Sequence, residues 1–305
     1  MMKRFFTFAL IAMLSCAVVY AQGSGPQPRP PGGGGTGGGG AGGKGTGGGD
    51  TVSPYNPKKD EKPLLFVFPS RVQTFEANGV KFSMTRVDGG TFRMGATLEQ
   101  GADADAGTNE RPVHSVTLNT YYIGTNKVTQ ALWEAVMNNR AASSKFGDLP
   151  VKCVSWDDCQ LFISRLNALT GRDFRLPTEA EWEFACRGGN KSQGYKYSGS
   201  NDLNSVAWYG DNSCFQTHPI GQKRENELGI YDMSGNVWEW CSDWYGGYSS
   251  LPQHNPTGPP SGTERVCRGG SSYSAAMKCR TTYRRHKEPT ESNHIVGLRL
   301  VLPAE

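Results

Sequence analysis

Features that would indicate several common classes of protein are scarce in this chain of 305 residues. No two cysteines stand at the short spacing of a structural zinc site. Charge of one sign is also scarce, because 32 basic and 28 acidic residues leave a net charge of only +4. This balance argues against nucleic acid as a partner. The histidines are few and scattered: His114, His218, His254, His286 and His294.

Long apolar runs are scarce as well, and the sequence has only one, from Phe5 to Ala21. Basic residues precede it, and Val19-Tyr20-Ala21 before Gln22 is typical of a signal-peptidase site. We predict a signal peptide over residues 1–21, cleaved near Ala21. The mature chain would have no transmembrane segment and would be secreted, periplasmic or held in the cell envelope. Two alternatives stay open: an uncleaved anchor, and lipid attachment at Cys16.

Glycine, by contrast, is abundant, and much of the total of 40 lies between Gln22 and Asp50. Such a segment buries too little apolar surface to offset the entropy of ordering it. We therefore predict a flexible Gly/Pro-rich linker over residues 22–61. The folded domain is predicted to span residues 62–305, which is long enough for one good core.

The start of that domain has the pattern of strands. Apolar and polar residues alternate over residues 82–87, Gly89-Gly90 predicts a turn, and residues 91–95 resume the strand pattern. Residues 101–111 read as a polar loop, and residues 113–122 alternate again as one further stretch.

Three helices with start signals follow. Thr129 is a candidate N-cap, whereas Ser155 with Asp158 and Thr178 with Glu181 each form a capping box. From Gly189 onward the periodicity fades into a long region of Gly, Asn, Ser, Trp and Tyr. The sequence therefore predicts an α+β domain that is rich in loops.

Cysteines offer one candidate for chemistry. Removal of the signal peptide leaves an odd number, which implies a free thiol or an intermolecular bridge. Cys159 and Cys186 lie in helical patterns and read as small buried residues. Cys279 follows Gly269-Gly270, and neighbouring Arg280 and Arg284 would lower its pKa. The alternative is that Cys279 is simply buried or bridged. The run 284–287 reads as a solvated loop or a local acid-binding feature.

Oxygen groups recur between Asp232 and Glu239, with Gly235 allowing a tight turn. Calcium takes six to eight oxygens, including backbone carbonyls, so the spacing fits a calcium loop. A plain turn that leads into a buried strand fits the same residues. Trp238 then reads as a core aromatic.

Several segments, in order, resemble the formylglycine-generating enzyme family, also called sulfatase-modifying-factor domains. The segments are 87–95, 127–129, 150–151, 154–156, 175–183, 235–240, 268–271 and 297–299. The resemblance extends over residues 81–301 and implies a loop-rich fold related to C-type lectins and stabilised by calcium. It assigns Asp232, Gly235, Val237 and Glu239 to one calcium site. It also implies that Ser271 and Trp238 line the pocket for substrate and oxygen.

Active members of that family use two thiolates, five positions apart, to hold copper(I) and convert a substrate cysteine to formylglycine. The resemblance places the later thiolate on Cys279, which is the copper-binding residue. The earlier position is Ser274. Copper(I) is soft and prefers sulfur, so a hydroxyl is a poor ligand, and the predicted copper site is incomplete. Cys267 precedes the Gly-Gly turn and is not expected to substitute.

Three functions stay open from the sequence. The first is an exported binding or envelope-assembly module whose partner is a protein or glycan in the envelope or outside the cell. The second is a formylglycine-generating oxidase with altered copper ligation. The third is another metal-dependent oxidation, since some relatives use iron, although no cluster of histidines with carboxylates stands out.

Overall fold

The computed structural model describes residues 70–98, 107–138 and 147–304. The predicted signal peptide, the linker and the first residues of the predicted domain lie outside these ranges. Within them, no helix has both the length and the apolar character needed to cross a bilayer. The helices and strands, in chain order, are β1 (Val72–Ala77), β2 (Val80–Val87), β3 (Gly90–Met94), η2 (Thr108–Glu110), β4 (His114–Leu118), β5 (Tyr121–Gly124), α1 (Gln130–Met137), α2 (Trp156–Thr170), α3 (Glu179–Cys186), η3 (Gly189–Lys191), α4 (Leu203–Val206), β6 (Trp238–Trp244), β7 (Gln253–His254), β8 (Arg265–Arg268), η4 (Ala276–Cys279), β9 (Arg284–Lys287), β10 (Val296–Gly297) and β11 (Val301–Pro303).

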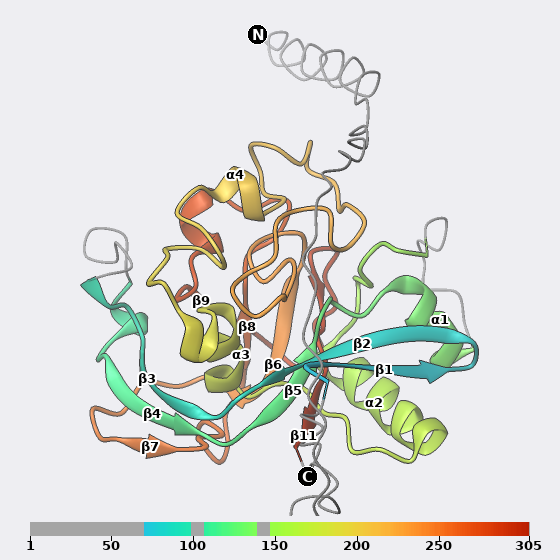
Figure 1. Cartoon of the computed structure of the whole chain (residues 1–305), viewed down its shortest axis with the longest axis horizontal. Helices are drawn as coiled ribbons and strands as arrows, with labels where there is room; N and C mark the ends of the chain where they lie inside the picture. Colours follow the sequence, from blue (N-terminus) through green and yellow to red (C-terminus); the bar gives the residue numbers. More distant parts are fainter. Residues whose placement is uncertain (1–69, 99–106, 139–146, 305) are drawn as a thin grey trace, which may run out of the picture. The chain divides into compact units, whose positions relative to one another are not determined.

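The strands form three small sheets, in the orders β1-β2-β5-β11, β10-β6-β8-β9 and β3-β4-β7. Most pairs are antiparallel, but β10 pairs with β6 and β4 pairs with β7 in parallel. Figure 1 shows α1 and α2 beside the β1-β2 hairpin, with α3 close to the second sheet. Short strands in several small sheets, with irregular chain between them, confirm the predicted loop-rich α+β fold.

The strand predictions for residues 82–87 and 91–95 are confirmed by β2 and β3, although these strands belong to different sheets. The prediction of one continuous stretch over residues 113–122 is wrong. The chain leaves one sheet after Leu118 and enters another at Tyr121. Gly89 packs against this bend, where its N–H donates to Thr120 Oγ1 over 3.0 Å. A Cβ at Gly89 would lie 2.6 Å from the carbonyl oxygen of Leu118, so the close approach requires glycine.

All three predicted helix starts are confirmed by their caps. Thr129 Oγ1 accepts from Leu132 N over 3.2 Å. In α2, Ser155 Oγ accepts from the N–H of Asp158 over 3.0 Å. A cap satisfies backbone donors that have no partner within the helix, which fixes where the helix begins.

The start of α3 is built in the same way. Thr178 Oγ1 accepts from Glu181 N over 3.2 Å, and Glu181 Oε2 accepts in return from Thr178 N over 2.9 Å. Gly188, with a φ of 91°, follows the C-cap Arg187 and turns the chain out of the helix.

The core consists of two large apolar clusters and one small one. The first lies between α1, α2 and the sheets, where the rings of Trp133 and Phe162 stack at 4.9 Å. The second contains Trp182 and Phe184 of α3. The third is small and gathers Cys279 with Tyr197, Tyr209 and their neighbours. Cys159 and Cys186 are fully buried, as predicted.

Hydrogen bonds from buried side chains to the backbone stabilise the irregular region between α4 and β6. Asn226 is the clearest case, since its amide donates to Ala185 O and its carbonyl accepts from Leu228 N and Ile230 N. One side chain thus fixes the turn that it starts and joins this turn to the end of α3. Backbone groups that lack a sheet or helix partner are satisfied in this way.

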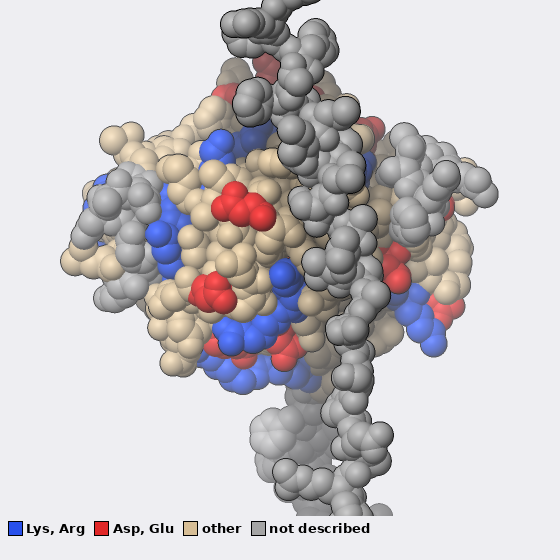
Figure 2. Space-filling model, turned by 90° about the horizontal axis from the view of Figure 1, so that it is seen from above, with Lys and Arg blue, Asp and Glu red and all other residues tan. Residues whose placement is uncertain are grey.

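Charged side chains of both signs share the face shown in Figure 2, where Lys and Arg lie close to Asp and Glu. This distribution agrees with the nearly balanced composition. The absence of a nucleic-acid partner stays a prediction.

Candidate functional site

The predicted copper position is a tight turn that Ser274 closes with its own side chain. Ser274 Oγ accepts from Ser271 N over 2.9 Å and lies 3.2 Å from Ser271 Oγ. Its carbonyl oxygen accepts from Gly210 N over 2.9 Å. Ser271 is fully buried and Ser274 nearly so. The hydroxyl at position 274 therefore has a structural role within the turn.

Cys279 ends the short helix η4 and lies fully buried behind this turn. Gly270 (φ 79°) passes so close that a Cβ there would lie 2.6 Å from Cys279 Sγ. Burial raises the pKa of Cys279 to about 12, and Lys127 and the Ser271 backbone offset this only in part. At neutral pH the side chain is a protonated thiol. A thiol binds metals and reacts as a nucleophile far less well than a thiolate.

The prediction that Arg280 and Arg284 lower the pKa of Cys279 is wrong, because both guanidinium groups have other partners. Arg280 pairs with Glu110 over 2.6 Å, and Arg284 pairs with Glu179 over 2.6 Å. Of the two alternatives for residues 284–287, the solvated loop is wrong and the acid-binding feature is confirmed, since Arg284, His286 and Lys287 each pair with a glutamate. This segment is strand β9, and its Arg284 is 4% exposed.

The segment that carries the other predicted site residues is bonded to this turn: Ser234 Oγ donates to Cys279 O over 2.8 Å, and Ser272 N donates to Asn236 O over 2.8 Å. Trp238 begins β6, belongs to the first cluster and has the guanidinium of Arg285 5.3 Å from its ring centre. Cys267 lies in the first cluster too, whereas Cys279 lies in the third. The described cysteines that are free thiols are Cys153, Cys159, Cys186, Cys241, Cys267 and Cys279.

One predicted calcium residue, Glu239, is the centre of a buried ionic cluster, which we call the Glu239 cluster: Glu239, Lys127, Arg299 and Trp182. Arg299 forms an ion pair with Glu239 over 2.9 Å. Lys127 forms a second ion pair with the same carboxylate. Trp182 Nε1 donates to Glu239 Oε2 over 2.6 Å. Burial would raise the pKa of Glu239, but Arg299 and Lys127 outweigh it and hold the pKa at about 2.

The remaining predicted calcium residues lie next to this cluster. Gly235 has a φ of 83°, and a Cβ at this position would lie 2.3 Å from the carbonyl oxygen of Trp208. Asp232 Oδ2 accepts from Gly221 N over 2.8 Å, and Asp232 Oδ1 is buried without a hydrogen-bond partner in the described part of the chain. Val237 offers its carbonyl oxygen to Lys127 Nζ over 2.9 Å. In the described ranges, no group of three or more His, Cys, Asp or Glu side chains is arranged to hold a metal ion.

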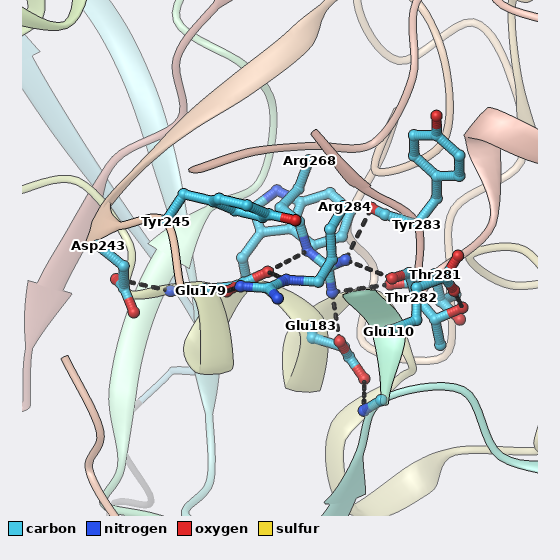
Figure 3. Close-up of polar contacts among 12 residues, drawn as sticks. Glu110, Glu179, Glu183, Asp243, Tyr245, Arg268, Thr281, Thr282, Tyr283 and Arg284 are labelled. Carbon is cyan, nitrogen blue, oxygen red and sulfur yellow. Dashed lines mark hydrogen bonds and ion pairs between the residues drawn. The ribbon is translucent and has the colours of Figure 1, made fainter. Parts of the chain in front are cut away.

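Sequence reasoning missed a second buried ionic network, which is drawn in Figure 3. Arg268 lies between two glutamates of α3, pairing with Glu183 and lying 3.6 Å from Glu179. It also donates to the carbonyl oxygens of Thr282 and Tyr283, both over 2.7 Å. The spacing of two glutamates one helical turn apart on α3 was a signal for a shared partner, but nothing in the sequence indicated which one.

Aromatic side chains gather at the surface beside the Ser274 turn. Tyr273 is 47% exposed, and its ring lies 5.7 Å from that of Phe215 and 5.0 Å from that of His294. Phe215 is 56% exposed and has a φ of 57°, which is unusual for a residue with a side chain. The backbone thus adopts a strained conformation at a residue that presents a large apolar ring to solvent. Strain of this kind clusters at binding sites.

A separate cavity of about 490 Å³ lies between α3, the end of β6 and residues 246–259. Asp243 lines it and accepts from Glu179 N over 2.9 Å and from Ser242 Oγ over 3.0 Å. Burial raises the pKa of Asp243 to about 7, and Glu179 adds to the effect. Figure 3 shows Asp243 on the side of Glu179 away from Thr281. Cavities with a carboxyl of shifted pKa are frequent ligand sites.

Residues 71–304 match the family described as the sulfatase-modifying factor enzyme 1-like domain. The chain belongs to this family. It is 34% identical over 222 residues to the chaperone protein LppX of Paenibacillus barcinonensis, covering 55% of this chain and 75% of that protein. It is 29% identical over 290 residues to the formylglycine-generating enzyme of Streptomyces coelicolor, covering 72% of this chain and 89% of the enzyme.

Solved structures give the same family fold. The chain resembles Treponema denticola variable protein 1 with a TM-score of 0.68 and 29% identity, over 76% of this chain and 99% of that one. It resembles PvdO from Pseudomonas aeruginosa with a TM-score of 0.67 and 21% identity, over 76% and 98% of the two chains. The fold is therefore the C-type-lectin-like fold of the formylglycine-generating enzymes. The second likeness supports the fold alone.

Proposed function

We propose that this chain is an exported binding or envelope-assembly module of the sulfatase-modifying-factor family, without copper-dependent oxidase activity. The observation that supports this most is the state of the Ser274 turn. The residue that stands in the place of one of the two copper thiolates is a hydroxyl that accepts from Ser271 N over 2.9 Å. The remaining sulfur, Cys279, is fully buried and its pKa is raised to about 12.

The chemistry of copper(I) explains why this exchange matters. Copper(I) binds tightly to sites built from soft sulfur donors, and a neutral hydroxyl is a hard donor. A single buried thiol would have to lose its proton at a cost set by its high pKa. We therefore expect Cys279 to hold copper(I) weakly and to have no role in oxidising a substrate cysteine.

The exposed aromatic group of Tyr273, Phe215 and His294 supports the binding half of the proposal. Large aromatic side chains dominate the energy of interfaces because they bury much surface at a small entropic cost. We propose that this aromatic surface contacts a protein or glycan ligand in the cell envelope or outside the cell. The similarity to a protein named as a chaperone, LppX, is in line with an assembly role.

The alternative is a formylglycine-generating oxidase, which the similarity to enzymes of that name supports. The bovine enzyme is 34% identical over 164 residues, covering 48% of this chain and 42% of the enzyme. This alternative requires that another ligand completes the copper site. Calcium, the other cofactor that the resemblance implies, is considered in the next subsection.

A copper-loading and turnover experiment tests the proposal. The full chain and its Ser274→Ala and Cys279→Ala variants would be incubated with copper(I), oxygen and a cysteine peptide of the sulfatase type, with aldehyde formation measured by mass spectrometry. We expect no aldehyde from the wild type or from Ser274→Ala. Aldehyde formed by the wild type and lost in Cys279→Ala would overturn the proposal in favour of the oxidase.

Loss of ligand binding in variants tests the aromatic surface separately. We expect Phe215→Ala and Tyr273→Ala to weaken retention of the full chain on isolated cell envelopes, with unchanged melting temperatures. Exposed Leu251, which is 69% accessible, provides a matched control, since Leu251→Ala removes a similarly exposed apolar side chain elsewhere. Equal retention of all three variants and the wild type would contradict the assignment of this surface.

A further inference from the structure

Lys127 lies where the sequence pattern predicts a calcium ion. It follows β5, precedes the N-cap of α1, and its side chain is fully buried. Its Nζ donates to Val237 O over 2.9 Å and forms an ion pair with Glu239 Oε1. Two of the four residues expected to bind calcium therefore direct their oxygens at an ammonium group of the same chain.

The donors that calcium requires are already used. Calcium takes six to eight oxygens at about 2.3–2.6 Å. Both oxygens of Glu239 are engaged: Oε1 by Lys127 and Arg299, and Oε2 by Trp182 and Arg299. A calcium ion bound to Val237 O and Glu239 would also lie against the Lys127 ammonium, and like charges repel strongly in a buried site. The residues present do not fit calcium while Lys127 keeps this position.

The charges around this position are also balanced without a metal. The carboxylate of Glu239 faces the cations Lys127 and Arg299, which also interact with Asp232, a carboxyl whose pKa is raised by burial. Two cations against two carboxyl groups already supply the positive charge that a further cation would bring. Burial of an unpaired charge is costly, so a balanced group of this kind is stable only when every member is present.

We propose that the Lys127 ammonium is a built-in substitute for a calcium ion, joining the turn before β6 to the segment between β5 and α1. The chain at Val237 and Glu239 is held to Lys127 by a hydrogen bond and an ion pair in place of metal coordination. The fold around β6 thus does not depend on calcium at this position. Because the oxygens themselves are retained, removal of the ammonium frees Val237 O and takes one donor from Glu239 Oε1, while Asp232 Oδ1 has no hydrogen-bond partner within the described ranges.

The test compares the response to calcium of the full chain and of two variants at position 127. Lys127→Met removes the charge but keeps much of the side-chain volume, and Lys127→Glu adds a carboxylate. Melting temperatures would be measured in excess calcium chloride and in excess chelator. For the wild type we expect the same melting temperature in both. For each variant we expect a lower melting temperature in chelator and a rise of roughly 5 °C with saturating calcium.

Lys287→Met provides the matched control, since Lys287 is also a buried lysine paired with a glutamate, Glu291. It should lose stability without gaining a response to calcium. If Lys127→Glu folds only in calcium, that outcome supports the proposal. An equal calcium response in the wild type, Lys127→Met and Lys287→Met would overturn it. So would a wild-type chain that binds one calcium ion and loses it in Glu239→Gln.

Discussion

The Glu239 cluster and the Ser274 turn occupy the two positions where the family resemblance implies metals, and they differ in kind. In the cluster every oxygen of Glu239 has a donor, and two of those donors are cations. In the turn, a hydroxyl replaces a sulfur and the remaining thiol is buried and protonated. In our proposals, the first position holds an ammonium group in place of a metal ion, and the second lacks one of two soft donors. The two positions would thus represent two ways in which a metal site can change: substitution of the ion and removal of a ligand.

The largest expected effect comes from breaking the cluster. Glu239→Gln leaves two buried cations without their carboxylate, and we expect a loss of about 3–5 kcal/mol in the free energy of unfolding. Denaturant unfolding measures this loss. The control is Glu264→Gln, because Glu264 is 36% exposed and pairs with a histidine at the surface. A loss below about 1 kcal/mol for Glu239→Gln would show that the cluster is not needed for stability.

The pH dependence of the same residue provides an independent check. The folded pKa of Glu239 is about 2, lower than its ordinary value of 4.5. The carboxylate therefore contributes stability that is fully present above about pH 4.5 and is lost as the pH falls toward 2. We expect the wild type to lose stability over this range more steeply than Glu239→Gln does. Parallel curves for the two proteins would contradict this assignment.

Asp243 is a buried carboxyl that contrasts with Glu239. The groups that donate to it, Glu179 N and Ser242 Oγ, carry no charge. Its folded pKa is about 7, against an ordinary value of 3.8, so the neutral form is favoured in the fold. The contribution of neutral Asp243 to the free energy of unfolding is fully present below about pH 3.8 and is lost as the pH rises through 7. We expect Asp243→Asn to stabilise the protein at pH 8 by up to about 4 kcal/mol, and by little at pH 4.

Thermal unfolding of this variant at the two pH values measures the difference. Exposed Asp173→Asn is the control and should change stability by less than about 0.5 kcal/mol at either pH. An Asp243→Asn variant that is less stable than the wild type at pH 8 would show that the ionised carboxylate is needed in the fold.

A smaller effect is expected where the Ser274 turn packs on Cys279. Gly270→Ala forces a residue into a φ of 79° and places its Cβ 2.6 Å from Cys279 Sγ, so we expect a loss of about 2 kcal/mol. The loss should be smaller in a Cys279→Ala background, which removes the sulfur from the clash. Equal losses in both backgrounds, measured by denaturant unfolding, would show that the sulfur does not restrict position 270.

Whether an interaction could be predicted from the sequence depends on how far apart its residues lie along the chain. The caps at Thr129, Ser155 and Thr178 were predicted because each uses residues three positions apart. The Glu239 cluster was not, since Glu239 meets Lys127 and Arg299 at separations of 112 and 60 residues. The calcium pattern rests on oxygens that are close in the sequence, but the sequence could not indicate that a distant lysine reaches two of them.

The Cys279 environment shows the same limit. The sequence placed two arginines close to the thiol along the chain and predicted a lowered pKa. The fold directs Arg280 to Glu110, 170 residues away, and buries the sulfur. The prediction that the second thiol is missing needs only the identity of one residue, Ser274, and not its partners, so it could be made from the sequence alone.

The smallest effect expected is on thiol reactivity, which leaves stability unchanged. Cys153 is exposed, whereas Cys279 is fully buried with a pKa of about 12. We expect a thiol reagent to modify Cys153 rapidly in the native protein and Cys279 only on unfolding. Fast labelling that persists in Cys153→Ser and disappears in Cys279→Ser would contradict the buried, protonated state of Cys279.

The central claim is that this chain lacks a copper(I) site of two thiolates, and metal stoichiometry tests it most directly. The full chain, Ser274→Cys and Cys279→Ala would be loaded anaerobically with copper(I), separated from free metal in the presence of a competing chelator, and analysed for copper per chain. The account predicts no retained copper that depends on Cys279 in the wild type, and a gain of up to one copper ion per chain in Ser274→Cys. One copper ion per wild-type chain, lost in Cys279→Ala, would contradict it.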